Sequence, residues 1–153
     1  MIEPPQIVNS PAQHIACIRL KIPPAEIRQV MMPGLQEIMA ALAAQGMKPA
    51  GPWLTHHFQK PVEMFDFEIA VPVATPIAPS GRVQPGQLRA TKVARTVYHG
   101  GYEGLVAAWG EFCDWISAEG LQTAPDLWEC YAKGPESGED SSNWETQLNQ
   151  PLA

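Results

Sequence analysis

The chain contains two segments that follow the same order of expected elements, and this duplication limits its possible folds more than any other feature. Residues 12–73 and 90–152 each read as a strand, a helix and two further strands, and each segment closes on a proline followed by an apolar residue. Two similar halves packed about a pseudo-twofold axis leave a cleft between them, and clefts are where small molecules bind. The duplication therefore predicts one domain over residues 1–153 with a central ligand cleft.

Three short matches carry the alignment of the two segments. In order, they are Ala12–Ala16 with Ala90–Ala94, Gln45–Met47 with Glu119–Leu121, and Val71–Val73 with Gln150–Leu152. The first helix is longer than the second by roughly one turn. We expect the extra length to produce a kink or a restart at Met31–Gly34, because Pro33 cannot donate a helical hydrogen bond.

Composition and charge exclude several classes of protein. The formal charge is −6 and the pI is about 5.1, whereas nonspecific nucleic-acid binding needs a basic face. The three cysteines form no CxxC pair and no even disulfide framework, which suits a reducing cytoplasm. No signal peptide opens the chain and no apolar run is long enough to span a bilayer. We therefore expect a cytoplasmic protein that neither enters a membrane nor binds nucleic acid directly.

Apolar periodicity and turn residues divide the chain into elements. The expected helices cover about 27–45 and 102–119, and the expected strands cover 13–22, 53–59, 63–73, 88–99, 127–133 and 144–149. Residues 1–11 read as a lead-in, 74–87 as a Pro- and Gly-rich connector, and 134–142 as an acidic loop. Gly46 is the expected C-cap of the first helix. Because strands outnumber helices and are joined by turns, the fold class should be α+β with a largely antiparallel sheet.

Several motifs resemble one known family. The segment Thr96–Leu105 resembles the strand-to-helix stretch "H-G-x-Y-x-x-L" of the GyrI-like domain, which is also the effector-binding domain of AraC-type transcription activators in the SOUL-like superfamily. Other stretches follow in the family's order: Gly51-Pro52, Asp66–Glu68, Val71–Val73, Trp115-Ile116, Glu119-Gly120, Trp128–Tyr131, Thr146–Leu148 and Pro151-Leu152. The resemblance covers nearly the whole chain.

The resemblance implies two β-α-β-β units around a central cleft that binds small, often cationic or aromatic, compounds. In multidrug-sensing regulators such a domain is fused to a DNA-binding domain, and here nothing precedes or follows it, so we expect a stand-alone binding module. Stand-alone relatives of this family also include gyrase inhibitors and hydrolases of strained cyclopropane-containing toxins. Protein interaction and hydrolysis therefore remain alternatives, and self-association into a homodimer through a strand edge or helix face is a further expectation.

Glu129 is the leading candidate for ligand binding. It lies in an expected strand between Trp128 and Cys130, where a carboxylate is costly unless it is paired or faces a cavity. By resemblance it matches the family's glutamate at the floor of the cleft. Strand alternation puts Glu129 and Tyr131 on one face. In a hydrolase, Glu129 would activate water and Tyr131 would steady the leaving group. The alternative is an edge-strand glutamate in water or in a structural salt bridge.

Aromatic side chains are the expected walls of the cleft, because aromatic faces attract cations. The expected walls are Trp109, Tyr131, His57 and Phe65, and further candidates are Trp53 and Tyr98. The helical spacing of Trp109 also fits an ordinary core position. His57 stands where the family commonly has tyrosine, and its partial charge near neutral pH would weaken a preference for cations.

Two remaining expectations concern acids and metals. Glu68 matches the family's acid in the first half, and it either lines the cleft or faces water. His56 and His57 are neighbours on a strand and point to opposite faces, so they cannot hold one metal ion together. The Gly100-Gly101 pair lacks the spacing of a phosphate-binding loop. We expect neither a metal nor an organic cofactor.

Overall fold

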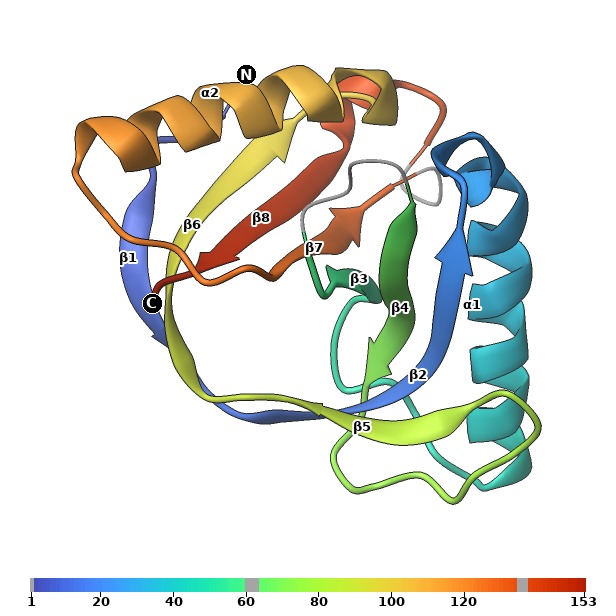
Figure 1. Cartoon of the computed structure of the whole chain (residues 1–153). Coiled ribbons are helices and arrows are strands. Elements are labelled where there is room, and N and C mark those ends of the chain that lie inside the picture. Colours follow the sequence, from blue (N-terminus) through green and yellow to red (C-terminus); the bar gives the residue numbers. More distant parts are fainter. Residues whose placement is uncertain (1, 60–63, 135–137) are drawn as a thin grey trace.

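The computed structural model describes residues 2–59, 64–134 and 138–153, which form two α-helices and one antiparallel sheet (Figure 1). The helices are α1 (Ile27–Ala44) and α2 (Leu105–Ala118), and short 3₁₀ turns over Pro24–Glu26 and Tyr102–Gly104 lead into them. The strands of the described residues are β1 (Gln6–Ser10), β2 (Gln13–Ile22), β3 (Leu54–His57), β4 (Phe65–Pro72), β5 (Gln84–Leu88), β6 (Thr91–His99), β7 (Leu127–Lys133) and β8 (Glu145–Pro151). The predicted α+β class with a largely antiparallel sheet is confirmed.

The strand order shows how the two halves are joined. The sheet runs β1-β6-β8-β7-β3-β4-β2-β5, so the three strands of each β-α-β-β unit are neighbours and the units meet at the β7–β3 pair. The strand that precedes each unit pairs with the other unit, since β1 lies beside β6 and β5 lies beside β2. Each half therefore completes the other's outer edge, which ties the duplicated units into one sheet.

The two edge strands were not expected from the sequence. The sequence predicts a lead-in over residues 1–11 and a connector over residues 74–87, whereas the structure forms β1 and most of β5 there. Pro85 and Gly86 hide the pattern of β5, yet an edge strand tolerates proline because one side of its backbone needs no partner. Gly86 is also required by space, because a Cβ there would lie 2.9 Å from Sγ of Cys17.

Helix α1 passes through Pro33 as one continuous helix, so the predicted restart is wrong. Pro33 is exposed, and its missing N–H costs a single hydrogen bond on the solvent side of the helix. The adjacent Gly34 is buried, and a Cβ there would lie 2.5 Å from Cδ1 of Ile69 on β4. The Pro-Gly pair therefore marks a close approach between helix and sheet.

Both helices end in the same way. Gly46 has a φ of 69° and its N–H bonds to Ala43, while the N–H of Met47 bonds to Leu42. Gly120 also has a φ of 69°, and the equivalent bonds run from Gly120 to Ser117 and from Leu121 to Ile116. This is the Schellman arrangement, in which a glycine takes the left-handed conformation and satisfies the last carbonyls. The predicted C-cap at Gly46 is confirmed.

Both helices pack on the same face of the sheet, which we call the helix face (Figure 1). Helix α1 buries Ile38 and Leu42 against β2 and β4, and α2 buries Phe112 and Ile116 against β6 and β8. Neither helix covers the middle of the sheet, where β3 and β7 meet. The fold thus leaves an uncovered strip between two packed helices.

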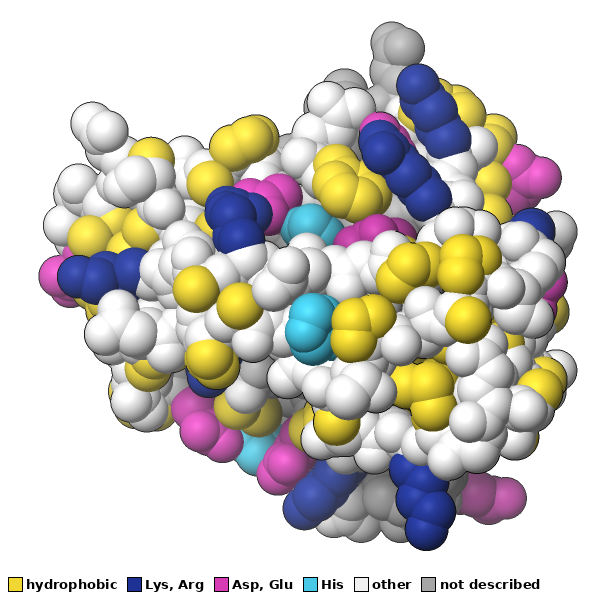
Figure 2. Space-filling model, turned by 90° about the horizontal axis from the view of Figure 1, so that it is seen from below, with side chains coloured by type: hydrophobic (Ala, Val, Ile, Leu, Met, Phe, Trp, Pro, Cys, Tyr) yellow, Lys and Arg dark blue, Asp and Glu magenta, His cyan; other side chains and the backbone are white. Residues whose placement is uncertain are grey.

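On the opposite face the sheet curls around a third cluster. Val93 from β6 and Ile15 from β2 come from different ends of the sheet, and both pack in one cluster with the central Trp128. Figure 2, which views the molecule from below, shows Lys and Arg side chains scattered among acidic and apolar ones. On that side they do not form the continuous basic surface of a nucleic-acid-binding face. No helix in the described ranges combines the length and apolar character that crossing a bilayer requires.

Candidate functional site

A large cavity occupies the uncovered strip of the helix face. Its volume is about 1070 Å³, which is close to the upper end of the range for small-molecule sites, roughly 300–1,000 Å³. The cavity lies between the N-terminal halves of α1 and α2 and above β3 and β7. The residues that line it are Ile27, Arg28, Met31, Met32, Leu35, Trp53, His57, Phe65, Tyr102, Glu103, Leu105, Val106, Trp109, Cys113, Leu127, Glu129, Tyr131 and Trp144. The predicted central cleft between the two halves is therefore present.

Glu129 lies at the floor of this cavity, on β7 and opposite Thr55 of β3. Its Oε1 accepts a 2.7 Å hydrogen bond from Nε1 of Trp109, and its Oε2 accepts a 2.9 Å bond from the hydroxyl of Tyr131. Burial raises the pKa of Glu129 above 4.5, and the two hydrogen bonds offset this only in part. The carboxylate is thus held in place by two donors, with no basic partner bonded to it in the described part of the chain.

Tyr131 extends the hydrogen-bonded chain below the cavity floor. Its hydroxyl lies 2.7 Å from Oγ1 of Thr55, and because it donates to Glu129, the threonine hydroxyl donates to it. Burial and the nearby Glu129 raise the pKa of Tyr131 well above 10, so the phenol stays protonated. The ring of Tyr131 also packs 4.6 Å from that of Trp53 and 5.8 Å from that of Tyr102. The group that orients the carboxylate is therefore part of the aromatic wall.

His57 and Phe65 form another part of the wall. The ring of His57 stacks on Phe67 at 5.1 Å and meets the edge of Phe65 at 5.5 Å. Burial, together with the neighbouring His56, lowers the pKa of His57 to about 4. His57 is therefore neutral at pH 7, and the expectation that its partial charge would oppose cations is wrong. Enclosure by phenylalanine rings is the physical reason, because burial disfavours the charged imidazole.

The formal charges around the cavity sum to a negative value. Arg28 and Glu103 line its rim with one charge of each sign, and the neutral His57 adds none. Glu129 then supplies the remaining charge. Apart from these residues the described lining is apolar or aromatic, so the described residues form a low-dielectric space with a net charge of −1 when Glu129 is ionised.

The structure brings together most of the expected site residues. Six of the eight line the cavity, and they are Glu129, Tyr131, Trp109, His57, Phe65 and Trp53. Sequence reasoning did not select Tyr102 and Trp144, whose rings lie 5.1 Å apart at the rim. The signal for Tyr102 was present, since it is the tyrosine of the H-G-x-Y motif. The contribution of Met31, Met32 and Leu35 depends on where α1 crosses the sheet, and no local pattern shows that.

Glu68 and Tyr98 lie elsewhere, so their placement in the cleft needs correction. On β4, Phe65 faces the cavity, and alternation then sends Glu68 to the opposite face. There its Oε1 lies 3.0 Å from Nδ1 of His56, and the glutamate is buried rather than facing water. Tyr98 is buried under the turn into α2, where its hydroxyl donates to the carbonyl of Gly101 at 2.8 Å.

A charged network surrounds His56 on that opposite face. Nε2 of His56 lies 2.8 Å from Asp126, which also receives two hydrogen bonds from Arg89 at 2.6 and 2.9 Å. Burial lowers the pKa of His56, but the bonds to Glu68 and Asp126 more than offset it and raise the pKa above 6.5. Burial raises the pKa of Asp126, and the bonds from Arg89 and His56 bring it below 3.8. His56 and His57 point apart, as predicted, and the described residues contain no His, Cys, Asp or Glu group arranged to hold a metal ion.

Solved structures with the same fold support this architecture. The chain matches the C-terminal domain of EcmrR with a TM-score of 0.87 at 19% identity, covering 98% of this chain and 97% of that domain. Against EcmrR in a DNA complex, the chain covers 57% of the longer protein, with a TM-score of 0.86 at 19% identity. It also matches SAV2435 bound to tetraphenylphosphonium (TM-score 0.68, 13% identity, 99% of this chain and 94% of that one). A hydrolase from Listeria innocua matches equally well (TM-score 0.68, 13% identity, 97% and 91%).

Sequence comparison gives the family. No curated protein matches the chain significantly. The profile of the family described as "GyrI-like small molecule binding domain" matches residues 3–153, which is nearly the full length. The duplicated units, the aromatic cavity between the helices and this full-length match agree. The chain belongs to the family of GyrI-like small molecule binding domains.

Proposed function

We propose that the cavity on the helix face binds lipophilic organic cations and that Glu129 is their counter-charge. The observation that carries this proposal is the Glu129 carboxylate at the floor of an aromatic cavity, held by Trp109 and Tyr131 with no basic partner among the residues that the structure describes. A cation that enters the cavity supplies the missing positive charge. The interaction is strong because the surrounding apolar walls screen it poorly.

The walls add selectivity for large, flat or branched aromatic cations. Each aromatic face that a cation contacts contributes roughly 0.5–2 kcal/mol, and the rings of Trp53, Tyr102 and Trp109 all border the space. Met31 and Met32 line the side formed by α1, and their flexible side chains adapt to ligands of different shape. The likeness to SAV2435 bound to tetraphenylphosphonium supports the same ligand class.

Calorimetric titration with tetraphenylphosphonium tests the proposal. We expect saturable binding at pH 7, and much weaker binding of neutral triphenylphosphine oxide, which has a similar aromatic body without the charge. Glu129→Gln keeps the size of the side chain and removes its charge, so it should weaken cation binding by about tenfold or more. Glu111→Gln removes an exposed charge of α2 that lies outside the cavity, and it should bind like the parent.

Two results would contradict cation binding. One is the absence of saturable heat with tetraphenylphosphonium and with other lipophilic cations of comparable size. The other is equal affinity of the Glu129→Gln and parent proteins, which would mean that the cavity binds through apolar contact alone.

Hydrolysis in the same cavity is a second candidate function. The observation that favours it is the pairing of a glutamate of raised pKa with a protonated tyrosine, because Glu129 can then act as a general base beside an acid. The likeness to the Listeria innocua hydrolase agrees with it. Incubation with a strained electrophilic compound separates the two functions: a hydrolase releases product over many turnovers, and Glu129→Gln abolishes it. Stoichiometric capture without product would leave binding as the function. Roles in gyrase protection, in regulation with a separate DNA-binding protein or as a homodimer remain predictions.

A further inference from the structure

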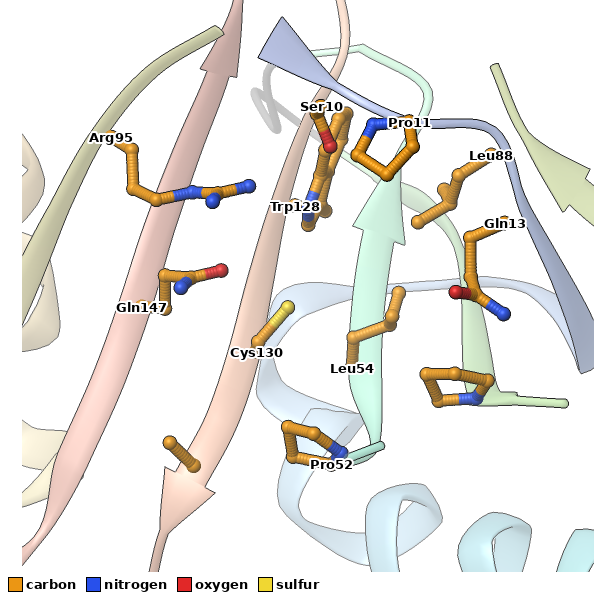
Figure 3. Close-up of a pocket in the computed structure, with 12 residues that line it drawn as sticks. Ser10, Pro11, Gln13, Pro52, Leu54, Leu88, Arg95, Trp128, Cys130 and Gln147 are labelled. Atoms are coloured by element: carbon orange, nitrogen blue, oxygen red, sulfur yellow. The ribbon is translucent and has the colours of Figure 1, made fainter. Parts of the chain in front are cut away.

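A second, smaller cavity lies on the opposite face of the sheet (Figure 3). Its volume is about 260 Å³, and it is bordered by the β1–β2 junction and by residues of strands β3 to β8. Trp128 and Cys130 of β7 line it, whereas the alternating Glu129 and Tyr131 line the large cavity. One strand therefore separates two cavities that share no lining residue.

The polar groups of this cavity are Arg95 and Gln147, and also Ser10 and Gln13. The amide nitrogen of Gln13 donates to the carbonyls of His14 and Val73, so its side-chain oxygen remains an acceptor. Nε of Arg95 donates to Oδ1 of Asn149 at 2.7 Å, and no described residue accepts a bond from the two terminal nitrogens of its guanidinium. The carbonyl oxygen of Gln147 accepts a 3.2 Å bond from Asn149, which leaves the amide N–H groups of Gln147 as donors. Figure 3 shows the side chains of Arg95 and Gln147 entering the cavity from the same side. An anion placed there would meet the terminal nitrogens of the Arg95 guanidinium, with the side chain of Gln147 beside them.

The second cavity carries a positive charge, which comes from Arg95. Among the described residues that line the cavity, Arg95 is ionised and none carries a carboxylate. Burial raises the pKa of the Cys130 thiol to about 12, so the thiol is neutral at pH 7. Asn149 holds the guanidinium of Arg95 in position. The two terminal nitrogens of this guanidinium form a planar fork that matches the geometry of a carboxylate.

The rest of the cavity is small and, apart from Ser10 and Gln13, apolar. Pro11, Leu54, Leu88 and the ring of Trp128 form its walls, opposite the donors in Figure 3. A hydrated inorganic anion gains nothing from such walls, whereas an organic acid buries its body against them. The volume lies below the usual range for drug-sized ligands, roughly 300–1,000 Å³, which restricts the ligand to a small acid.

We propose that this cavity is a second binding site, specific for small monocarboxylic acids with a flat apolar body, whose carboxylate pairs with Arg95. The site is independent of the cation site because the two cavities lie on opposite faces. Benzoate is a suitable probe, and benzamide is its neutral counterpart of the same shape.

The experiment is a titration monitored by the indole N–H resonances of ¹⁵N-labelled protein. Benzoate should shift the resonance of Trp128 in a saturable manner and leave that of Trp109, in the large cavity, in place. Benzamide and inorganic phosphate should bind at least about tenfold more weakly than benzoate. Glu129→Gln should bind benzoate like the parent, which keeps this test separate from the test of cation binding.

Variants of Arg95 complete the test. Arg95→Gln should weaken benzoate binding by about tenfold or more. Arg95→Lys keeps the positive charge but not the planar fork, so its affinity for benzoate should lie between those of Arg95→Gln and the parent. Unchanged resonances elsewhere in the spectrum show that each variant is folded. Saturable shifts at Trp109 rather than Trp128, equal affinity for benzamide, or no shift at millimolar benzoate would each overturn the proposal.

Discussion

Nε1 of Trp109, on α2, donates a 2.7 Å hydrogen bond to Oε1 of Glu129, on β7. This bond joins a helix to the uncovered middle of the sheet, across the space in which the proposed ligand lies. It fixes the orientation of the carboxylate while leaving its charge uncompensated by any bonded base in the described residues. The relationship leads to predictions about affinity, pH and stability.

Replacing Trp109 with phenylalanine should weaken cation binding and make it more sensitive to acid. Phenylalanine keeps an aromatic wall but removes the N–H donor, so the pKa of Glu129 should rise further. We expect a loss of affinity on the order of tenfold at pH 7, the value of a hydrogen bond to a charged group. The pH at which half the affinity is lost should also move upward, as measured by titration calorimetry between pH 5 and 8.

Trp115→Phe is the matched control for this prediction. Trp115 lies on the same helix and packs against the α2 core cluster, and it does not line the cavity. Its substitution should leave both the affinity and the pH dependence unchanged. Equal behaviour of the Trp109 and Trp115 variants would contradict a role for the indole bond.

Replacing Glu129 with glutamine should raise the thermal stability of the protein at neutral pH. The folded-state pKa of Glu129 lies above its ordinary value of 4.5, so the folded protein favours the protonated carboxyl. The resulting stabilisation is fully present below about pH 4.5 and is lost as the pH rises through the higher folded-state pKa. In its ionised form the desolvated group destabilises the fold, and glutamine avoids this. We expect Tm to rise by on the order of a few degrees, with the gain shrinking at acidic pH in differential scanning calorimetry.

Glu111→Gln serves as the control here too, because Glu111 is exposed on α2. It should change Tm little at either pH. A lower Tm for Glu129→Gln than for the parent at pH 7 would refute this interpretation of the buried carboxylate.

Replacing His56 with glutamine should destabilise the protein and alter its response to alkaline pH. His56 lies between Glu68 and Asp126, and the bonds to both raise its pKa in the folded protein above 6.5. The stability that His56 contributes is therefore fully present below pH 6.5, and it is lost as the pH rises through the folded-state pKa of His56. Asp126 has a lowered pKa, so its contribution is present above 3.8 and is lost as the pH falls through its folded-state value. Removing the cation leaves the buried Glu68 carboxylate without its histidine partner, whereas Asp126 keeps its bonds from Arg89, and we expect a cost of roughly 3–5 kcal/mol.

Urea unfolding at pH 6 and pH 9 measures both effects. The parent should lose stability between these values, and His56→Gln should lose less, since the titrating group is gone. His14→Gln is the control, because the side chain of His14 makes no hydrogen bond or ion pair with other described residues. If the two variants have the same stability at pH 6, the network does not stabilise the fold.

Replacing Gly34 with alanine should destabilise the protein although alanine favours helices. The new Cβ would lie 2.5 Å from Cδ1 of Ile69, which is fully buried and has little room to move. Ile69→Val removes that atom, so the double variant should recover part of the loss. Gly110→Ala on α2 meets nothing within 4 Å and should stabilise by about 0.5–1 kcal/mol. Stabilisation by Gly34→Ala would contradict the close approach of α1 to β4.

Local patterns predicted the regular elements well where they contained no turn residues. Strand β7 has the predicted bounds, and α1 and the C-cap at Gly46 follow from helical spacing and a terminal glycine. Strand β5 was missed because Pro85 and Gly86 are read as turn residues, and only its position at the sheet edge makes them acceptable. Pro33 was read as a break, yet packing of α1 against the sheet keeps the helix continuous.

Local strand alternation also predicted part of the candidate site. Alternation along β7 placed Glu129 and Tyr131 on one face, which needs only a strand. The same rule, applied to β4, shows that Phe65 and Glu68 cannot both face one cavity. Which of them faces the helices depends on the register between β4 and its neighbours.

The sequence by itself determined the two units, their α+β character, the glycine caps and the candidate glutamate, since each of these follows from local periodicity, local chain geometry or a family motif. Only the tertiary structure decided that α1 and α2 leave the centre of the sheet uncovered, that Trp109 reaches Glu129, and that His57 is neutral at pH 7. The exchange of edge strands and the cavity beside Arg95 also belong to the assembled sheet. The physical reason is that burial, electrostatic environment and the meeting of distant strands depend on how elements pack, and packing joins residues that no local pattern connects.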